Sequence, residues 1–185
     1  LERGADINAR QHQGAMPIHD AAQQGHAAVV RLHVECGADT EVRDVAGKKA
    51  SELTQNERIR VTLRPANVKH LRERSYIKSA KEGCLWRMRL LLNAGVQADF
   101  KEGDSTALHF CALAGHIECI RLLIGKRANV GARQRTGVQP LHLCAAAGKL
   151  ECARLLIEAG ADIDAQSDTG KAALHHCATR GHDKL

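Results

Sequence analysis

Short runs of apolar and small residues, separated by glycines, predict pairs of short helices along the chain. In the clearest stretch, residues 136–168, a first helix is expected over Leu141–Ala147, directly after Pro140 and before Gly148. Proline suits the first turn of a helix, where its missing N–H would have no partner, and glycine suits the left-handed residue that ends one. A second helix is expected over Leu150–Glu158. Its apolar face is formed by Ala153, Leu155 and Leu156.

This pair of helices recurs with a period of 33 residues. Glycine, histidine and cysteine keep the period, at Gly115, Gly148 and Gly181, at His109, His142 and His175, at Cys111, Cys144 and Cys177, and at Cys119 and Cys152. A repeat of this length is one supersecondary unit that buries its apolar face only against its neighbours. The period therefore predicts a stacked array of helix pairs.

Two stretches carry the motif of a known family. Residues 136–168 read TGVQPLHLCAAAGKLECARLLIEAGADIDAQSD, and residues 14–44 read GAMPIHDAAQQGHAAVVRLHVECGADTEVRD. Both resemble the ankyrin repeat, and the resemblance covers nearly the whole chain. It implies an all-α solenoid of helix-turn-helix units joined by β-hairpin-like turns. It also implies a protein–protein recognition module without catalysis, so that we expect no enzyme activity and no cofactor.

Departures from the motif predict how the array is divided. The unit at Gly47–Leu63 has Glu52 at the histidine position and a short second helix, which is typical of a closing repeat. The unit at Ser75–Asp99 has Tyr76 and Ile77 where the family shows Leu-His, which is typical of an opening repeat. We therefore expect a first stack over 1–64, a basic junction over 65–74 and a second stack over 75–185, with a helix over Val68–Lys81 joining the stacks.

Both ends of the chain are expected to be cut inside a repeat. Leu1–Arg10 reads as the tail of an earlier unit, and His175–His182 starts a unit whose second helix is missing. Terminal repeats carry a polar outer face, which neither end has. We interpret the 185 residues as a fragment of a longer array, or as a chain resolved in part.

Composition excludes several function classes. Aromatic residues make up 2%, which argues against an aromatic barrel core and against a stacking platform for single-stranded nucleic acid. No apolar run reaches membrane-spanning length, and no secretory signal opens the chain. Seven cysteines are an odd number, which argues against a disulfide framework. We expect an intracellular protein, cytoplasmic or nuclear, because thiols persist in reducing compartments.

The cysteines and histidines have structural interpretations. His109 and Cys111 are two residues apart on a helix and so point in different directions, which argues against a metal site. Equivalent cysteines of successive repeats are expected at a helix-packing distance of ~10 Å, too far for a disulfide. Cys36 and Cys84 fall outside this set and are expected to be more exposed. The resemblance implies that the histidines join their own turn to the next repeat, and His33 is expected at a half-exposed stack edge.

Arg127 stands where other units have Gly4, Gly37, Gly95 and Gly160. A left-handed arginine would cost ~1 kcal/mol or more. We favour the interpretation that Gly125 ends the helix early, and a left-handed Arg127 is the alternative.

Positive charge gathers around the junction. The net charge of the chain is +6, whereas Arg58–Arg89 holds ten Lys and Arg against Glu73 and Glu82. A solvated face, an acidic protein partner, and nucleic acid or anionic lipid are the possible explanations. The candidate residues are Arg64, Lys69, Arg72, Arg74, Lys78 and Lys81.

In ankyrin-like units the exposed variable positions are the hairpin tip and the end of the first helix. Carried onto this chain, they predict a partner surface on the concave side of the second stack, with an apolar centre and an arginine-bearing rim. Its residues are Phe110, Leu113, Ala146, His176, Thr179, Arg180, Lys101, Arg133, Gln134 and Arg135. The expected partner is a protein or peptide with an apolar anchor flanked by acidic residues. Alternatively, Phe110 and Leu113 only pack against neighbouring helices.

Two other functions remain open at this point. The chain could be a regulatory ankyrin segment of a larger enzyme, channel or ubiquitin-ligase subunit. It could also bind nucleic acid or anionic lipid electrostatically through the basic junction.

Overall fold

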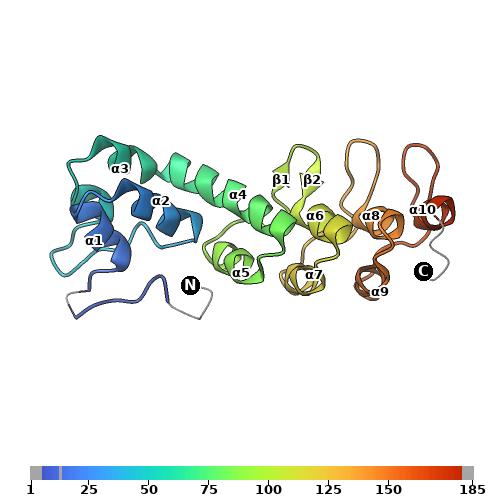
Figure 1. Ribbon diagram of the computed structural model, residues 1–185, viewed down its shortest axis with the longest axis horizontal. Coiled ribbons are helices and arrows are strands. Elements are labelled where there is room, and N and C mark those ends of the chain that lie inside the picture. The colour runs from blue at the N-terminus through green and yellow to red at the C-terminus, as the bar shows by residue number, and fades with distance from the viewer. Residues whose placement is uncertain (1–5, 13, 181–185) are drawn as a thin grey trace. The chain divides into compact units, whose positions relative to one another are not determined.

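The structure is a computed structural model that describes residues 6–12 and 14–180, with Arg180 described in its backbone alone (Figure 1). These residues form an all-α repeat fold with short hairpins between the helix pairs. The helices are α1 (Pro17–Gln23), α2 (Ala27–Glu35), η1 (Ala50–Glu52), α3 (Glu57–Thr62), α4 (Pro65–Glu82), α5 (Leu85–Asn93), α6 (Ala107–Ala114), α7 (Ile117–Gly125), α8 (Pro140–Ala146), α9 (Leu150–Glu158) and α10 (Ala173–Arg180). Two short antiparallel strands, β1 (Lys101–Glu102) and β2 (Ser105–Thr106), form one hairpin.

The helix pair predicted from the apolar pattern is confirmed. The first helix, α8, begins one residue earlier than expected, at Pro140, and α9 has the predicted bounds. Gly148 joins them with a left-handed φ of 64°. Ala153 and Leu156 are buried on the inner face of α9, whereas Leu155 is half-buried. Small side chains in the first helix allow the two helices to pack closely.

Contacts divide the chain into two compact units. Unit 1 comprises Leu1–Tyr76 and Arg89–Val96, and unit 2 comprises Ile77–Met88 and Gln97–Leu185. In unit 1, α2 packs against α1 and α3. In unit 2, α6, α8 and α10 pack side by side in chain order, with α7 and α9 below them (Figure 1). The expected boundaries at 64 and 74 stay a prediction.

The helix predicted over Val68–Lys81 is present and longer than expected. It is α4, which begins at Pro65 and ends at Glu82. Pro65 begins the helix without leaving an N–H unpaired. Side chains of Val68, Tyr76 and Ile77 are buried, so the helix has an apolar side that is removed from water.

Buried histidines join successive turns, as the family resemblance implies. His109 Nδ1 accepts from the backbone N–H of Thr106 at 3.2 Å, and its Nε2–H donates to the carbonyl of Val138 at 3.3 Å. His142 makes the same pair of bonds and donates to Lys171 O at 3.1 Å. Because Nδ1 is an acceptor, Nε2 must carry the proton. Each ring thus caps its own helix and connects it to the next hairpin.

Glu52 reproduces only half of this arrangement. Its Oε2 accepts from the backbone N–H of Lys49 at 3.0 Å, which is the bond that histidine Nδ1 makes elsewhere. An ionised carboxylate has no hydrogen to donate, so Glu52 cannot form a hydrogen bond to the carbonyl of a following hairpin. The chain continues after Glu52 into α3 and α4 instead of another hairpin.

The favoured interpretation of Arg127 is wrong. Helix α7 does end at Gly125, but this position is equivalent to Glu158 at the end of α9, so the helix does not end early. Arg127 adopts φ 59°, the only positive φ of a non-glycine residue in the described part of the chain. Gly37, Gly95 and Gly160 are left-handed at the same position. The packing of α7 requires this turn whatever residue occupies it.

Candidate functional site

The predicted partner surface lies within unit 2. We define the helix–hairpin face as the ends of α6, α8 and α10 together with the hairpin residues before them. Its helix residues are Phe110, Leu113, Leu143, Ala146, His176 and Thr179, and its hairpin residues are Lys101, Arg133, Gln134 and Arg135. Leu143 was not among the residues predicted from the sequence. The 33-residue period could have found it, because Leu143 stands between Phe110 and His176 in the same series.

Leu113 is the most exposed apolar side chain of this face. It is 51% exposed, whereas Phe110, Leu143 and Ala146 are half-buried. The Lys81 ammonium lies 4.6 Å from the centroid of the Phe110 ring, which is a cation–π contact. Water therefore reaches the apolar centre mainly at Leu113.

The tip side chains connect neighbouring hairpins. Arg133 donates to the carbonyl of Gln166 at 3.2 Å and pairs with Asp168 at 3.3 Å. Gln134 donates to the Ser105 hydroxyl at 2.6 Å. The Lys101 ammonium lies 3.4 Å from the carbonyl of Arg133. Three of the four predicted rim residues thus hold the hairpins together.

Arg135 is the most available cation of the rim. Its side chain is 84% exposed, and its Nε lies 3.4 Å from Asp104 Oδ2. An ion pair this exposed contributes little to stability, so its partner can be exchanged at small cost. The rim as a whole has carboxylates beside its arginines and is more balanced in charge than expected.

The C-terminal end of the face is described in part. Thr179 is exposed, and its hydroxyl donates to the carbonyl of His176 at 3.1 Å. The rings of His142 and His176 meet edge to face with centroids 5.7 Å apart, which ties α10 to α8. The predicted contribution of Arg180 falls on a side chain outside the described residues.

The basic junction is divided between the two units. Arg64, Lys69, Arg72 and Arg74 belong to unit 1, and Lys78 and Lys81 belong to unit 2. Most of these cations have a nearby carboxylate: Arg64 pairs with Glu57, Lys69 with Glu73, Lys78 with Glu82 and Lys81 with Glu102.

Arg72 is a structural cation of the junction. It is half-buried and donates to the carbonyl of Ala38 at 2.6 Å and to that of Ala94 at 3.3 Å. Burial lowers the pKa of its guanidinium, an effect that nearby Asp39 and Glu41 oppose. These bonds tie the end of α2 to the end of α5, and Arg72 lines a cavity of about 500 Å³ there.

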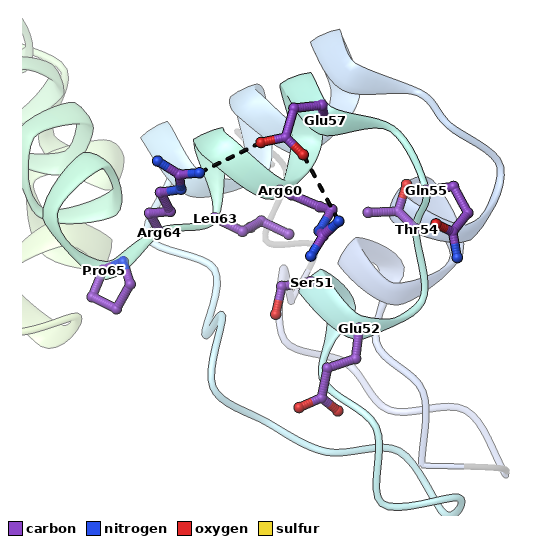
Figure 2. Close-up of a pocket in the computed structure, with 9 residues that line it drawn as sticks. All are labelled: Ser51, Glu52, Thr54, Gln55, Glu57, Arg60, Leu63, Arg64 and Pro65. Atoms are coloured by element: carbon purple, nitrogen blue, oxygen red, sulfur yellow. Dashed lines mark hydrogen bonds and ion pairs between the residues drawn. The ribbon is translucent and has the colours of Figure 1, made fainter.

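A second cavity of unit 1, of about 470 Å³, lies beside Arg64 (Figure 2). Glu57 stands between the two arginines of its wall, 3.4 Å from Arg64 and 3.8 Å from Arg60. Ser51, Glu52, Thr54 and Gln55 complete its polar lining. Because Glu57 neutralises both guanidiniums in part and Glu52 adds a second carboxylate, the cavity does not present a strong field to an anion.

The cysteines are arranged differently from the expectation. Cys36 was expected to be exposed, but it is 1% exposed because the end of α2 packs against α5. A Cβ added at the neighbouring Gly37 would lie 3.1 Å from the carbonyl of Leu90. Cys84 is half-buried, and no disulfide joins any of the seven cysteines.

Cysteines also recur within single repeats. Cys119 follows Cys111 by eight residues across the turn at Gly115, and Cys152 follows Cys144 by the same separation across the turn at Gly148. All four thiols are buried. Cys111 Sγ lies 3.6 Å from the carbonyl of Ala80, and Cys144 Sγ lies 3.6 Å from that of Ala112.

The described residues bring together no group of three His, Cys, Asp or Glu side chains that could hold a metal ion. None of their helices combines the length and apolarity needed to cross a membrane.

Known proteins resemble this chain through its repeats. A family model for three copies of the ankyrin repeat matches residues 77–167 and again 130–185. An ankyrin repeat and KH domain-containing protein of Caenorhabditis briggsae is 29% identical over 136 residues, 70% of this chain. The ankyrin repeat and KH domain-containing protein mask-1 of Caenorhabditis elegans is 27% identical over 124 residues, 63% of this chain. This chain spans about 5% of the length of either relative.

The fold and the comparison agree. The family model matches the region in which left-handed glycines join the helix pairs. In this region the buried histidines are bonded to the next hairpin. Since the match covers more than half of the residues, this chain belongs to the ankyrin repeat family.

Proposed function

We propose that the chain is a protein-binding module without catalysis and that its partner binds on the helix–hairpin face of unit 2. The observation that carries this proposal is the exposure of Leu113, 51%, beside the half-buried Phe110 and Ala146. Ankyrin repeats generally mediate protein–protein interaction, which supports the general role. Interfaces owe most of their affinity to a few apolar and arginine side chains that become fully desolvated.

The rim favours a partner with acidic residues beside its apolar anchor. A carboxylate of the partner can replace Asp104 at Arg135, because the existing ion pair is exposed and weak. Arg133 is less available, since it also holds the carbonyl of Gln166. We therefore expect Arg135 to set the charge preference and Leu113 to contribute most of the affinity.

The two relatives support the proposal that the chain is a repeat module, but they say nothing about the partner that it binds. Both contain KH domains by name, and this chain matches only about 5% of each. A recognition segment within a larger protein is consistent with this match. The KH domains of the relatives carry no argument for nucleic-acid binding by these repeats.

The test begins with an affinity pull-down and cross-linking mass spectrometry to find a partner. Two pairs of variants then compare the helix–hairpin face with matched positions elsewhere. Leu113→Arg is paired with Leu32→Arg on α2, where the leucine is 50% exposed. Arg135→Glu is paired with Arg154→Glu on α9. Like Arg135, Arg154 is exposed and lies beside a single carboxylate, that of Glu151.

Leu113→Arg should weaken binding by about tenfold or more, mainly through faster dissociation. Arg135→Glu should slow association and reduce its salt dependence. The control variants should bind like the parent, and all four should keep its melting temperature. Folded Leu113→Arg and Arg135→Glu variants with the affinity of the parent would contradict the proposed face.

A further inference from the structure

The hairpin before α8 carries an exposed threonine close after two arginines. Residues 133–137 read RQRTG, so that Arg133 and Arg135 stand three positions and one position before Thr136. All three residues are exposed. Protein kinases that select basic substrates use acidic grooves, which bind cationic side chains just before the serine or threonine that they phosphorylate. The hairpin tip therefore has the charge pattern of a substrate for such a kinase.

The same spacing occurs at one other place in the sequence. Arg72 and Arg74 stand three positions and one position before Ser75. Ser75 lies within α4 and is 7% exposed. A kinase must bring the hydroxyl group of its substrate to the γ-phosphate of ATP, and a buried serine cannot reach it while the helix is folded. The structure therefore leaves Thr136 as the accessible residue with this pattern.

The turn around Thr136 is small and lies at the surface. Two backbone hydrogen bonds of 2.9 Å close it, from the N–H of Gln134 to the carbonyl of Val138 and from the N–H of Gly137 to the carbonyl of Gln134. Kinases bind the substrate segment in an extended form, so these bonds must open. Exposed loop tips are among the parts of a protein that open most readily. Opening the tip also releases Arg133 from its bond to the neighbouring hairpin.

The partners of the two arginines can be exchanged. Arg135 Nε lies 3.4 Å from Asp104 Oδ2, and Arg133 Nη2 lies 3.3 Å from Asp168 Oδ1. These are exposed ion pairs, which contribute little to stability. The N–H of Asp168 donates to the carbonyl of Thr136 at 3.0 Å, so Asp168 and its arginine lie beside the threonine. Both guanidiniums are thus available to an acidic groove and, after the reaction, to a phosphate on Thr136.

The next hairpin provides a comparison inside the same molecule. Thr169 follows Thr136 by 33 residues and is also exposed. Its turn is closed by the same two backbone bonds, from the N–H of Ser167 to Lys171 O at 3.0 Å and from the N–H of Gly170 to Ser167 O at 2.9 Å. The residues three positions and one position before Thr169 are a glutamine and an aspartate. The two threonines therefore share a turn and differ in the charge that precedes them.

We propose that Thr136 is a phosphorylation site for a serine/threonine protein kinase that selects basic substrates. Thr136 Oγ1 attacks the γ-phosphorus of ATP. The bond between that phosphorus and the bridging oxygen breaks, and ADP leaves with the bridging oxygen. The hydroxyl proton passes to the catalytic aspartate of the kinase. The product is a phosphothreonine at the hairpin tip.

The phosphate changes the charge of the rim. It adds a charge of about −2 near neutral pH and three strong acceptor oxygens. It competes with Asp104 for Arg135 and with Asp168 for Arg133, because charge-assisted bonds to phosphate are strong. A partner with acidic residues would then be repelled. This last consequence rests on the proposed function, whereas the modification itself does not.

The test incubates the full chain with the catalytic subunit of cyclic AMP-dependent protein kinase, ATP and Mg²⁺, and maps phosphopeptides by mass spectrometry. Thr136 should be phosphorylated at least about tenfold faster than Thr169, because only Thr136 presents cations to the acidic groove. Arg133→Gln, which gives Thr136 the residue that precedes Thr169, should slow the reaction at Thr136 by about tenfold or more. The control Arg154→Gln, an exposed arginine on α9, should leave the rate unchanged.

A second variant transfers the pattern to the next hairpin. Gln166→Arg combined with Asp168→Arg should raise the rate at Thr169 to within about threefold of the parent rate at Thr136. This gain does not depend on how Arg133→Gln folds, and circular dichroism checks all variants. Equal rates at Thr136 and Thr169 in the parent, phosphate confined to Ser51 or Ser75, or no gain at Thr169 in the double variant would each overturn the proposal. No partner is needed for this test, so a wrong partner surface would leave its result unchanged.

Discussion

Among single residues, the described part of the backbone holds one residue other than glycine, Arg127, in the left-handed conformation. The turn after each second helix requires a left-handed residue, which glycine adopts freely and L-residues with a Cβ do not. Arg127 adopts it at φ 59°, where Gly160 has φ 91° in the next repeat. The strain arises because helix stacking decides the path of the turn, and the arginine must follow it.

Arg127→Gly should therefore stabilise unit 2. We expect the free energy of unfolding to rise by about 1 kcal/mol, measured by urea unfolding. The reciprocal change Gly160→Arg should lower it by about the same amount. No atom lies within 4 Å of a Cβ added at Gly160, so the effect there is conformational. A neutral or destabilising Arg127→Gly would show that the arginine is not strained.

His109 makes the fold sensitive to acid. Burial lowers the pKa of His109 below its ordinary 6.5, nearby Lys101 acts in the same direction, and the bond to Val138 O opposes them. The unfolded chain therefore binds a proton at a higher pH than the folded chain does. The contribution of neutral His109 to the free energy of unfolding is fully present above pH 6.5. It is lost progressively as the pH falls from 6.5 to the lower pKa of the folded state.

His109→Gln should separate this effect from the other titrations. The variant should be less stable than the parent at pH 7.5, because the bridge is weakened. It should lose less stability than the parent between about pH 7 and pH 5, because it has no imidazole to protonate. Urea unfolding at several pH values measures both quantities. Parallel curves for parent and variant would contradict the assignment.

At the scale of elements, α4 replaces the hairpin that other repeats use to join their helix pairs. Arg72 on this helix donates to the carbonyls of Ala38 and Ala94. These carbonyls follow α2 and α5, where helix ends leave acceptors without partners. One side chain thus satisfies the ends of two helices.

Arg72→Ala should destabilise unit 1 by about 2 kcal/mol, because hydrogen bonds from a charged donor are lost at half-buried carbonyls. Arg74→Ala, an exposed arginine on the same helix, should change stability by less than about 0.5 kcal/mol. Urea unfolding of both variants makes the comparison. Similar effects would show that charge at the junction, rather than the two bonds, is what matters.

At the scale of the whole molecule, α4 runs without interruption from unit 1 into unit 2. Residues along it are buried in each unit, among them Val68 and Ser75 in unit 1 and Ser79 and Ala80 in unit 2. A flexible linker has neither helical bonds nor buried side chains. Residues 65–82 therefore form one helix with side chains buried in each unit.

Hydrogen exchange should show this directly. The amides of residues 68–76 should exchange slowly, whereas those of the exposed hairpin tip at Val45 and Ala46 should exchange fast. Mass spectrometry of peptides across both segments measures the difference. Fast exchange throughout 68–74 would mean that the two units are joined by a linker.

Much of this architecture could be predicted because it depends on local signals. The bounds of α9 follow from apolar spacing and Gly148, and those of α8 were predicted to within one residue, because these signals act within one helix pair. The bridging histidines follow from their period, since each repeat places its ring in the same environment. The candidate face followed from the same register, although Leu143 was overlooked in it.

Which segments are helical and how they repeat can be read from the chain alone, because helix periodicity and glycine turns are properties of neighbouring residues. Which side chains meet depends on tertiary packing. The burial of Cys36, the bonds of Arg72 to Ala38 and Ala94 and the ion pair of Arg135 with Asp104 all depend on contacts between separate elements. Such contacts depend on how one element covers another, and residues far apart along the chain carry no local mark of it.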